Sequence, residues 1–395
     1  MPPIPAKPPK VAADLAKGNL TVFLGDSNTA GTDGNYSGGQ FQMGSSSYVT
    51  WACLQSGGRI RLLANKGVGG ETSTQILARI QAVIDLAPDW GVLMMGTNDM
   101  TSYAAAPDAT LATLFANIEA AERRLRGAGI NVALCTILPN GTAQYRPGII
   151  RANAWIRWYC QRRGVHLLDL YAQAVDPTIS GTWRAGYAQG DNVHTSQVGA
   201  KALGLYVAQH LAPLMPLYTP TLCSSNVTSE DPNLLANGIM VGDANADGIA
   251  NSWGVTGSGG TVTWSLETDP DIVGQWQVLT VASSGARSLA QGVSPGASTF
   301  ADGDVIAFAG RLTATLEAGS MTCTVRLAFS ATDGPFYLSP VTSINRDLDN
   351  AVFYGQMAVP AGTTLMQPQI SNGSGTGVIK AAQVSVYNLT ELGLV

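Results

Sequence analysis

Charged side chains are scarce in this sequence. Asp, Glu, Lys and Arg together make up 12% of the 395 residues, about half of the roughly 25% that is usual. The net charge is −5 and there is no basic run, so we expect no nucleic-acid partner. No apolar stretch reaches the roughly 18 residues that a membrane-spanning helix needs, so we expect no membrane partner either.

Cysteine is also rare, and its pattern excludes the usual cysteine-based sites. The five cysteines are odd in number and far apart, which fits neither a disulfide framework nor a zinc site. We predict that they are small buried hydrophobic residues in a chain that folds in a reducing compartment. Residues 1–18 are rich in proline and lack the apolar segment of a secretory signal, so we interpret them as an N-terminal extension.

The length of the chain predicts two domains of different texture. In residues 19–215, apolar strand-like runs alternate with helical patterns, which predicts a three-layer α/β sandwich around a parallel sheet. Residues 216–232 are rich in Thr, Ser and Pro, as a linker would be. Residues 233–395 hold short alternating segments between turns, which predicts an all-β sandwich. The predicted strands of the first domain are 20–24, 59–65, 92–95, 131–138 and 165–170.

A Gly-Asp-Ser-Asn stretch at residues 25–28 directly follows the first predicted strand. The glycine lets the chain turn sharply, and Ser27 then stands at the carboxyl edge of the sheet, where open α/β folds bind their ligands. Alone, the same four residues are ordinary turn chemistry. The functional interpretation therefore depends on the stretches that follow.

The chain has three histidines, so the search for a general base is short. His166 falls inside a predicted strand and His210 near the end of the last predicted helix. His194 instead lies in a polar loop, three residues after Asp191. That spacing lets the carboxylate orient one ring nitrogen while the other faces a nucleophile such as Ser27, as a serine hydrolase requires.

Two further loops supply hydrogen-bond donors for an oxyanion. Residues 65–72 follow the second predicted strand, and Gly70 there exposes its backbone N–H. Residues 96–99 follow the third strand and carry the amide of Asn98. Because the carboxyl ends of parallel strands meet at one edge, a doubly wound sheet would bring these loops together.

These four stretches resemble the sequence blocks of the SGNH, or GDSL-type, hydrolase family, over about residues 19–212. The resemblance implies a flavodoxin-like sheet, no metal or cofactor, and hydrolysis of esters, including acetyl groups on sugars. Ser27 would be the nucleophile, His194 the base and Asp191 its orienting residue. The oxyanion donors would be the N–H groups of Ser27 and Gly70 and the side chain of Asn98. The chain departs from many members at Asn28, where they carry leucine.

The substrate is predicted from the loops that face the site. Flat aromatic rings beside short polar groups suit sugars better than acyl tails. We expect a carbohydrate esterase that removes O-acetyl groups from an acylated carbohydrate, such as a bacterial surface polysaccharide; a lipid or aryl-ester esterase is the alternative. An alternative of another class is a phage tail receptor-binding module with a vestigial hydrolase fold. The candidate substrate-binding residues are Tyr36, Tyr145, Trp183, Arg184 and Tyr187.

The opening of the second domain, residues 233–253, is similar to carbohydrate-binding jelly-roll domains appended to phage tail proteins and secreted glycosidases. The similarity predicts a domain that holds polysaccharide, with Trp253, Trp264 and Tyr354 stacking on sugar rings. The alternative is that these rings fill the core and the domain mediates homo-oligomer assembly. We expect a virion tail component or release by lysis, and we expect residues 1 to about 215 to hydrolyse small esters alone.

Asp243, Asn245 and Asp247 match the first half of a calcium-binding loop. The glutamate that such a loop carries at its twelfth position is replaced by Gly254. We therefore predict a polar turn and no metal site, with weak calcium binding as the alternative.

Overall fold

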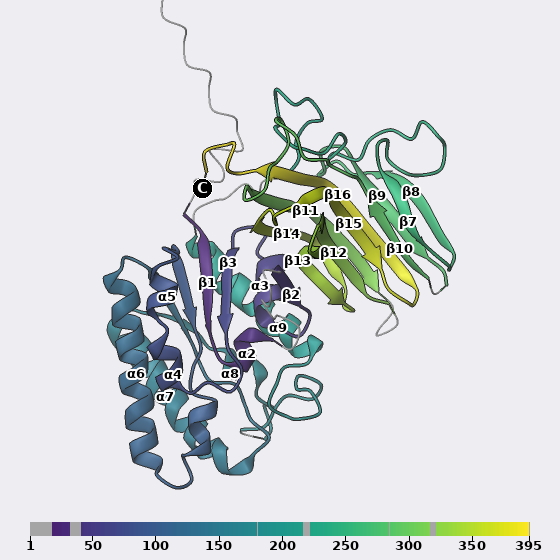
Figure 1. The fold of residues 1–395 in the computed structure, drawn as a ribbon. Coiled ribbons are helices and arrows are strands. Elements are labelled where there is room, and N and C mark those ends of the chain that lie inside the picture. The colour runs from purple at the N-terminus through teal and green to yellow at the C-terminus, as the bar shows by residue number, and fades with distance from the viewer. Residues whose placement is uncertain are drawn as a thin grey trace, which may run out of the picture.

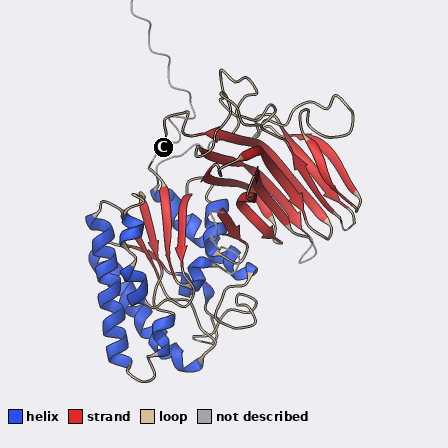
Figure 2. Cartoon of the chain, viewed as in Figure 1, coloured by secondary structure: helices blue, strands red, loops and turns tan. Residues whose placement is uncertain are grey.

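The computed structural model describes residues 18–31, 41–179, 181–215, 222–283, 285–316 and 321–394. The first half of the chain forms an α/β domain and the second half a β-domain, which lie side by side (Figure 1). Helices are confined to the α/β domain, apart from turns, in the part of the chain that is described (Figure 2). The predicted fold class is confirmed.

The α/β domain is built on a five-stranded parallel sheet of order β3-β1-β4-β5-β6. Its strands β1 and β4 are buried almost throughout because helices cover both faces. The strands are β1 Leu20–Gly25, β3 Arg61–Gly67, β4 Trp90–Leu93, β5 Asn131–Cys135 and β6 His166–Leu168. The predicted strands 20–24, 59–65, 92–95 and 165–170 match β1, β3, β4 and β6 to within two residues at each end, whereas 131–138 runs past the end of β5 by three residues.

Helices α3 and α9 pack on one face of the sheet, and α4 to α7 pack on the other (Figure 1). The long helices α6 and α7 begin with a proline in the first turn, a position where proline is common. Helix α7 ends at Gly164 in the left-handed conformation, which is a common helix C-cap. The helices are α2 Ser27–Ala30, α3 Tyr48–Gln55, α4 Ser73–Ala78, α5 Gln81–Ile84, α6 Pro107–Gly127, α7 Arg146–Arg163, α8 Leu170–Ala174 and α9 Gln197–Leu211, with short 3₁₀ turns at Asn98–Thr101, Ala143–Tyr145 and Ala212–Leu214.

The β-domain consists of two sheets of order β2-β13-β12-β15-β10-β7 and β14-β11-β16-β9-β8. Its own strands pair antiparallel, as the alternating pattern predicts. They are β7 Gly254–Ser258, β8 Val262–Thr268, β9 Gln275–Val281, β10 Ala286–Ala290, β11 Val305–Leu316, β12 Cys323–Ala331, β13 Gly334–Ile344, β14 Leu348–Ala358, β15 Thr363–Asn372 and β16 Gly377–Asn388.

Two elements of the α/β domain were not expected from the sequence. The strand β2, Phe41–Gly44, pairs in parallel with β13 and so belongs to a sheet of the β-domain. Helix α3 follows it and buries seven of its eight residues, so it lacks the amphipathic period that marks a surface helix. One hydrophobic cluster accordingly runs through both domains, from Trp51 and Leu203 to Leu338 and Phe353.

Residues 222–232, expected in the linker, bond to the β-domain. Asp231 accepts a hydrogen bond from Tyr387 Oη at 2.8 Å and from Ser224 N at 2.7 Å. Burial, first of all, and then the nearby Asp231 carboxylate raise the pKa of Tyr387 far above its usual range. This part of the chain is therefore packed against β16.

Two of the three rings expected to form a sugar platform are buried. Trp253 donates its indole N–H to Asn237 O at 2.8 Å. Tyr354 contacts the α/β domain, where its hydroxyl accepts from Arg61 Nη2 at 3.3 Å. The expectation of exposed stacking was wrong for these two residues because they pack within the β-domain and its junction. Trp264 is half-buried against the core.

All five cysteines are buried and unpaired, as predicted. Burial raises the pKa of Cys223 to about 11, which keeps the thiol protonated. Among the described helices, none combines the length and the apolar character needed to cross a membrane.

Candidate active site

The chain turns sharply after β1 because residue 25 is glycine. A Cβ at Gly25 would lie 2.1 Å from Thr29 Oγ1 and 2.6 Å from the carbonyl oxygen of Met94. Asp26 then caps the N-terminus of the short helix α2, and its side chain accepts a hydrogen bond from Asn28 N at 3.0 Å. Ser27 is the first residue of that helix and is half-buried at the carboxyl edge of the sheet.

A chain of hydrogen bonds joins Ser27 to His194 and Asp191. His194 Nε2 lies 2.9 Å from Ser27 Oγ, and His194 Nδ1 lies 2.6 Å from Asp191 Oδ2. The His194 side chain is 30% exposed, so solvent reaches it. The three residues predicted from the spacing are thus brought together in the order that activates a serine.

Asp191 is held as an anion by its own loop. Its Oδ1 accepts from Val193 N at 2.9 Å and from His194 N at 3.0 Å, which leaves Oδ2 for the imidazole. Burial opposes ionisation of this carboxyl, but the hydrogen bonds from the His194 ring and from the two N–H groups outweigh it and lower its pKa.

Hydrogen bonds to Asn192 fix the turn between Asp191 and His194. Asn192 adopts a left-handed backbone conformation with φ 56°. Its carbonyl oxygen accepts from Trp183 Nε1 at 2.9 Å and from Gly141 N at 2.8 Å. Gly141 cannot be larger, because a Cβ there would lie 2.5 Å from the Cβ of Asn192.

Two of the three expected oxyanion donors, Gly70 and Asn98, lie on loops that are bonded to each other. Gly70 is exposed and has φ +79°, a backbone conformation that favours glycine, so no side chain of its own stands beside its N–H. Asn98 Nδ2 donates one hydrogen bond to Glu71 O at 2.9 Å. An amide nitrogen has two hydrogens, so the bond to Glu71 orients the group and leaves a second donor.

Residues 23–202 match the model of the GDSL-like Lipase/Acylhydrolase family, and this range contains all four loops. This part of the chain is a GDSL-type hydrolase domain. Among curated proteins, none matches the chain.

Two solved structures illustrate the likeness of the hydrolase domain. A GDSL-like lipase from Bacteroides thetaiotaomicron is 22% identical, with a TM-score of 0.39, and the match covers 52% of this chain and 95% of that one. An acetylxylan esterase from Geobacillus stearothermophilus is 23% identical, with a TM-score of 0.40, covering 50% and 95%.

Supporting residues of the hydrolase domain were missed by the sequence analysis. Arg79 donates to Glu71 Oε2 at 2.6 Å and to Gly25 O at 2.9 Å, and so ties the Gly70 loop to the end of β1. Asp99 accepts from Ser73 N at 2.8 Å and so ties the Asn98 loop to the start of α4. The acidic residue directly after Asn98 was the signal that could have indicated such a brace.

Asp26 is a buried carboxyl directly beside the nucleophile. It is 0% exposed, and its Oδ1 accepts the hydrogen bond from Asn28 N. Burial raises its pKa from 3.8 to about 6, and the bond from Asn28 N–H only partly opposes that rise. The hydrolase domain therefore carries a carboxyl next to Ser27 that titrates near neutral pH.

The candidate substrate-binding residues fall into different settings. Tyr36 lies outside the described residues. Tyr145 is half-buried at the start of α7, and the guanidinium of Arg184 stands 5.4 Å from the ring centre of Tyr187 at the surface. Trp183 is only 9% exposed and its N–H is engaged by the catalytic loop, so it supports that loop from behind. Their contact with substrate remains a prediction.

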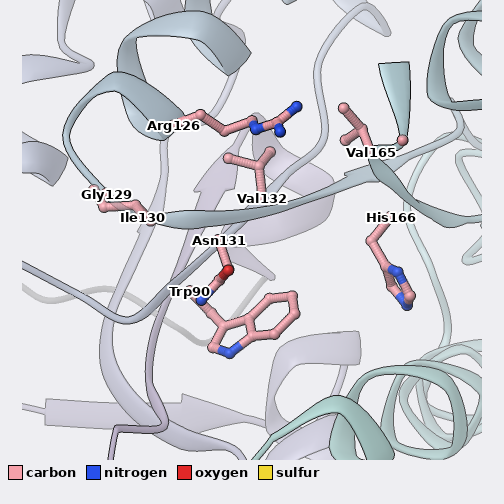
Figure 3. Close-up of a pocket in the computed structure, with 9 residues that line it drawn as sticks. Trp90, Arg126, Gly129, Ile130, Asn131, Val132, Val165 and His166 are labelled. Carbon is pink, nitrogen blue, oxygen red and sulfur yellow. The ribbon is translucent and has the colours of Figure 1, made fainter. Parts of the chain in front are cut away.

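A cavity of about 290 Å³ lies at the opposite edge of the sheet. It is lined by Trp90, Asn131 and His166, among others (Figure 3). Trp90, Asn131 and His166 are the first residues of β4, β5 and β6, whereas Ser27 follows the carboxyl end of β1. The cavity is therefore separate from the Ser27 site.

No group of three or more His, Cys, Asp or Glu that could hold a metal occurs among the described residues. In the loop that resembles a calcium site, Asp243 accepts from Asp247 N at 3.0 Å and from Gly248 N at 2.9 Å. Both carboxylate oxygens of Asp243 thus serve the loop itself. These are the hydrogen bonds of a polar turn, and weak calcium binding by Asp243, Asn245 and Asp247 stays a prediction.

Proposed function

We propose that the hydrolase domain is a serine esterase that removes acyl groups, chiefly O-acetyl groups, from a carbohydrate. The observation that carries the proposal is the hydrogen-bonded chain Ser27–His194–Asp191, with distances of 2.9 and 2.6 Å. Complete retention of this chain favours an enzyme over a recognition module on a vestigial hydrolase fold, because recognition alone does not need an aligned nucleophile and base.

Ser27 Oγ attacks the ester carbonyl while His194 Nε2 takes its proton. The negative charge on the former carbonyl oxygen is stabilised by the N–H of Gly70 and the free hydrogen of Asn98 Nδ2. The C–O bond to the alcohol then breaks, and His194 gives the proton to the departing oxygen. Water repeats the two steps on the acyl-enzyme and releases the acid.

Asp191 keeps the imidazole in the tautomer that presents Nε2 to the serine, and it stabilises the imidazolium that forms. Its lowered pKa means that the carboxylate is charged throughout the neutral range. The hydrogen bonds that Asn192 O accepts from Trp183 and Gly141 also hold the imidazole in place, because a shift of this turn would move the His194 ring away from Ser27.

The carbohydrate part of the proposal rests on the surface beyond the His194 loop. Arg184 and Tyr187 form a cation–π pair there, and Arg184 is exposed. A flat ring beside a guanidinium offers both a stacking surface and hydrogen-bond donors, which suits a sugar hydroxyl face better than a long acyl chain. A role of the β-domain in binding polysaccharide or in oligomer assembly, as in a phage tail protein, is a further prediction.

The test is acetate release from a panel of acetylated bacterial and plant polysaccharides, run beside aryl esters of increasing acyl length. The proposal predicts acetate release from at least one polysaccharide and a preference for short acyl chains. Ser27→Ala is the matched control, because it removes the nucleophile with little change in volume. A preference for long acyl chains would favour the lipid-esterase alternative.

A further inference from the structure

One strand of the hydrolase domain lies in a sheet of the β-domain. β2 pairs in parallel with β13, with Phe41 opposite Leu338 and Gly44 opposite Thr342, and it forms the edge of the six-stranded sheet (Figure 1). The β-domain therefore fixes the position of the chain that follows β2.

That chain is the turn at residues 44–47, called the β2 turn below. Ser47 Oγ donates to Thr29 O at 3.4 Å, two residues beyond Ser27. A Cβ on Gly31 would lie 2.6 Å from the Cβ of Ser47, so the two segments touch. The β2 turn thus packs against the helix that carries the nucleophile.

The β2 turn also holds the residue directly after His194. Thr195 Oγ1 donates to Ser46 O at 2.7 Å, and Thr195 is almost completely buried. The turn itself is fixed by Trp51, whose Nε1 donates to Ser45 O at 2.7 Å. One short turn therefore contacts both sides of the Ser27 to His194 hydrogen bond.

A second connection runs from the β-domain to helix α9. In the loop between β13 and β14, Asn345 N donates to Gln197 Oε1 at 3.2 Å, and Asp347 O accepts from Lys201 Nζ at 2.6 Å. Gln197 begins α9 three residues after His194. The β-domain is thus bonded to the chain downstream of the base as well as to the chain downstream of the nucleophile.

We infer that the β-domain sets the alignment of Ser27 and His194. Thr195 is the positioning residue through which the β-domain fixes the place of His194. The inference rests on the proposed function, since it assigns the β2 turn and the β13–β14 loop to the same site. Displacing a reacting group by about 1 Å can lower a rate roughly 100-fold. The hydroxyl of Thr195 and the ammonium of Lys201 are therefore expected to matter for turnover although neither touches substrate.

The test uses four variants of the full chain with an aryl acetate as substrate. Thr195→Val removes the donor to Ser46 O and keeps the side-chain shape, and Thr195→Ser restores the hydroxyl. Lys201→Met removes the donor to Asp347 O. Thr21→Val is the control, because Thr21 is a buried threonine whose hydroxyl donates to Asn19 O at 3.2 Å at the other edge of the sheet.

The expected result is a roughly 10- to 100-fold lower kcat with an unchanged KM in Thr195→Val. Thr195→Ser recovers most of the loss, Lys201→Met shows a smaller loss of the same kind, and Thr21→Val keeps the parental kcat. If Thr195→Val and Lys201→Met match the Thr21→Val control, the inference is overturned. Lys201→Met keeps the test decisive if Thr195→Val does not fold.

A readout without turnover separates this inference from the proposed function. The chain has three histidines, so the ring ¹H–¹⁵N resonances of His194 can be assigned by comparison with His194→Gln. Thr195→Val should shift these resonances and Thr21→Val should not. If the parental protein hydrolyses no ester, the proposed function fails, while an unshifted His194 signal in Thr195→Val would refute the positioning role by itself.

Discussion

Replacing Asp26 by asparagine should stabilise the protein at neutral pH and leave its stability at pH 4 unchanged. The Asp26 side chain is 0% exposed, and burial raises its pKa from 3.8 to about 6. A shift of about 2 units corresponds to about 3 kcal/mol between the two protonation states. Asparagine is neutral at every pH and accepts the Asn28 N–H bond as well as aspartate does.

The direction of this pH dependence is set by which state of the protein, folded or unfolded, binds the Asp26 proton. Between pH 3.8 and about 6 the folded protein keeps the Asp26 proton that the unfolded chain has lost, so stability falls as the pH rises through this window. Above pH 6 the parental protein carries the full cost of a buried carboxylate. The free energy of unfolding of Asp26→Asn should then exceed that of the parent by up to about 3 kcal/mol at pH 7 to 8, and the difference should vanish near pH 4.

Denaturant unfolding followed by tryptophan fluorescence at pH 4, 5, 6, 7 and 8 measures this difference. Asp85→Asn is the control, because Asp85 is exposed and the asparagine keeps an acceptor for Gln81 Nε2. The Asp26→Asn variant should also turn over more slowly above pH 6, since the buried anion favours the His194 imidazolium. If the variant is less stable than the parent at pH 8, or if the difference does not change with pH, Asp26 is not a buried carboxylate that destabilises the folded state.

Three other changes have expected outcomes. Asn98→Ala should lower kcat roughly 10²- to 10³-fold with little change in the denaturation midpoint, as steady-state kinetics on an aryl acetate would show. Trp183→Phe removes a donor to Asn192 O and should cost about 1 kcal/mol of stability and lower kcat, and an unchanged kcat would argue against a positioning role for this hydrogen bond. A chain that ends at residue 215 should lose turnover of small esters, because the hydrophobic cluster shared with the β-domain would be exposed; full activity of a folded truncation would contradict this.

The parallel sheet and the hydrogen-bonded chain from Ser27 through His194 to Asp191 could be predicted from sequence, because each depends on local signals. Apolar runs end at the loops that carry Ser27, Gly70 and Asn98, and a parallel sheet places such loops at one edge. His194 was identified because the chain has few histidines and a carboxylate stands three residues before it. These inferences needed no knowledge of contacts between distant parts of the chain.

The junction between the domains could not be predicted because it depends on such distant contacts. β2 has four residues and pairs with β13, which lies about three quarters of the chain length away in sequence. α3 is buried on almost all sides, so its apolar residues do not follow a helical period. Tyr354 looked like a surface ring, but it packs beside Tyr387 of the β-domain and contacts Arg61 of the α/β domain.

The sequence led us to expect that the α/β domain acts alone on small esters and that the β-domain only binds polymer. The junction between the domains changes this expectation. An independent hydrolase on a flexible tether would gain only effective concentration from its second domain. In the structure the β2 turn and the β13–β14 loop instead reach the segments that follow Ser27 and His194. Instability of the β-domain is therefore expected to appear as lost turnover on small esters as well as on polymers.

Covalent trapping shows whether Ser27 is a nucleophile that His194 activates. The full chain is incubated with a fluorophosphonate, digested, and mapped by peptide mass spectrometry. We predict one adduct, on the peptide that contains Ser27, lost in Ser27→Ala and formed far more slowly in His194→Ala. An adduct on another residue, or equal labelling of the parent and Ser27→Ala, would contradict the account.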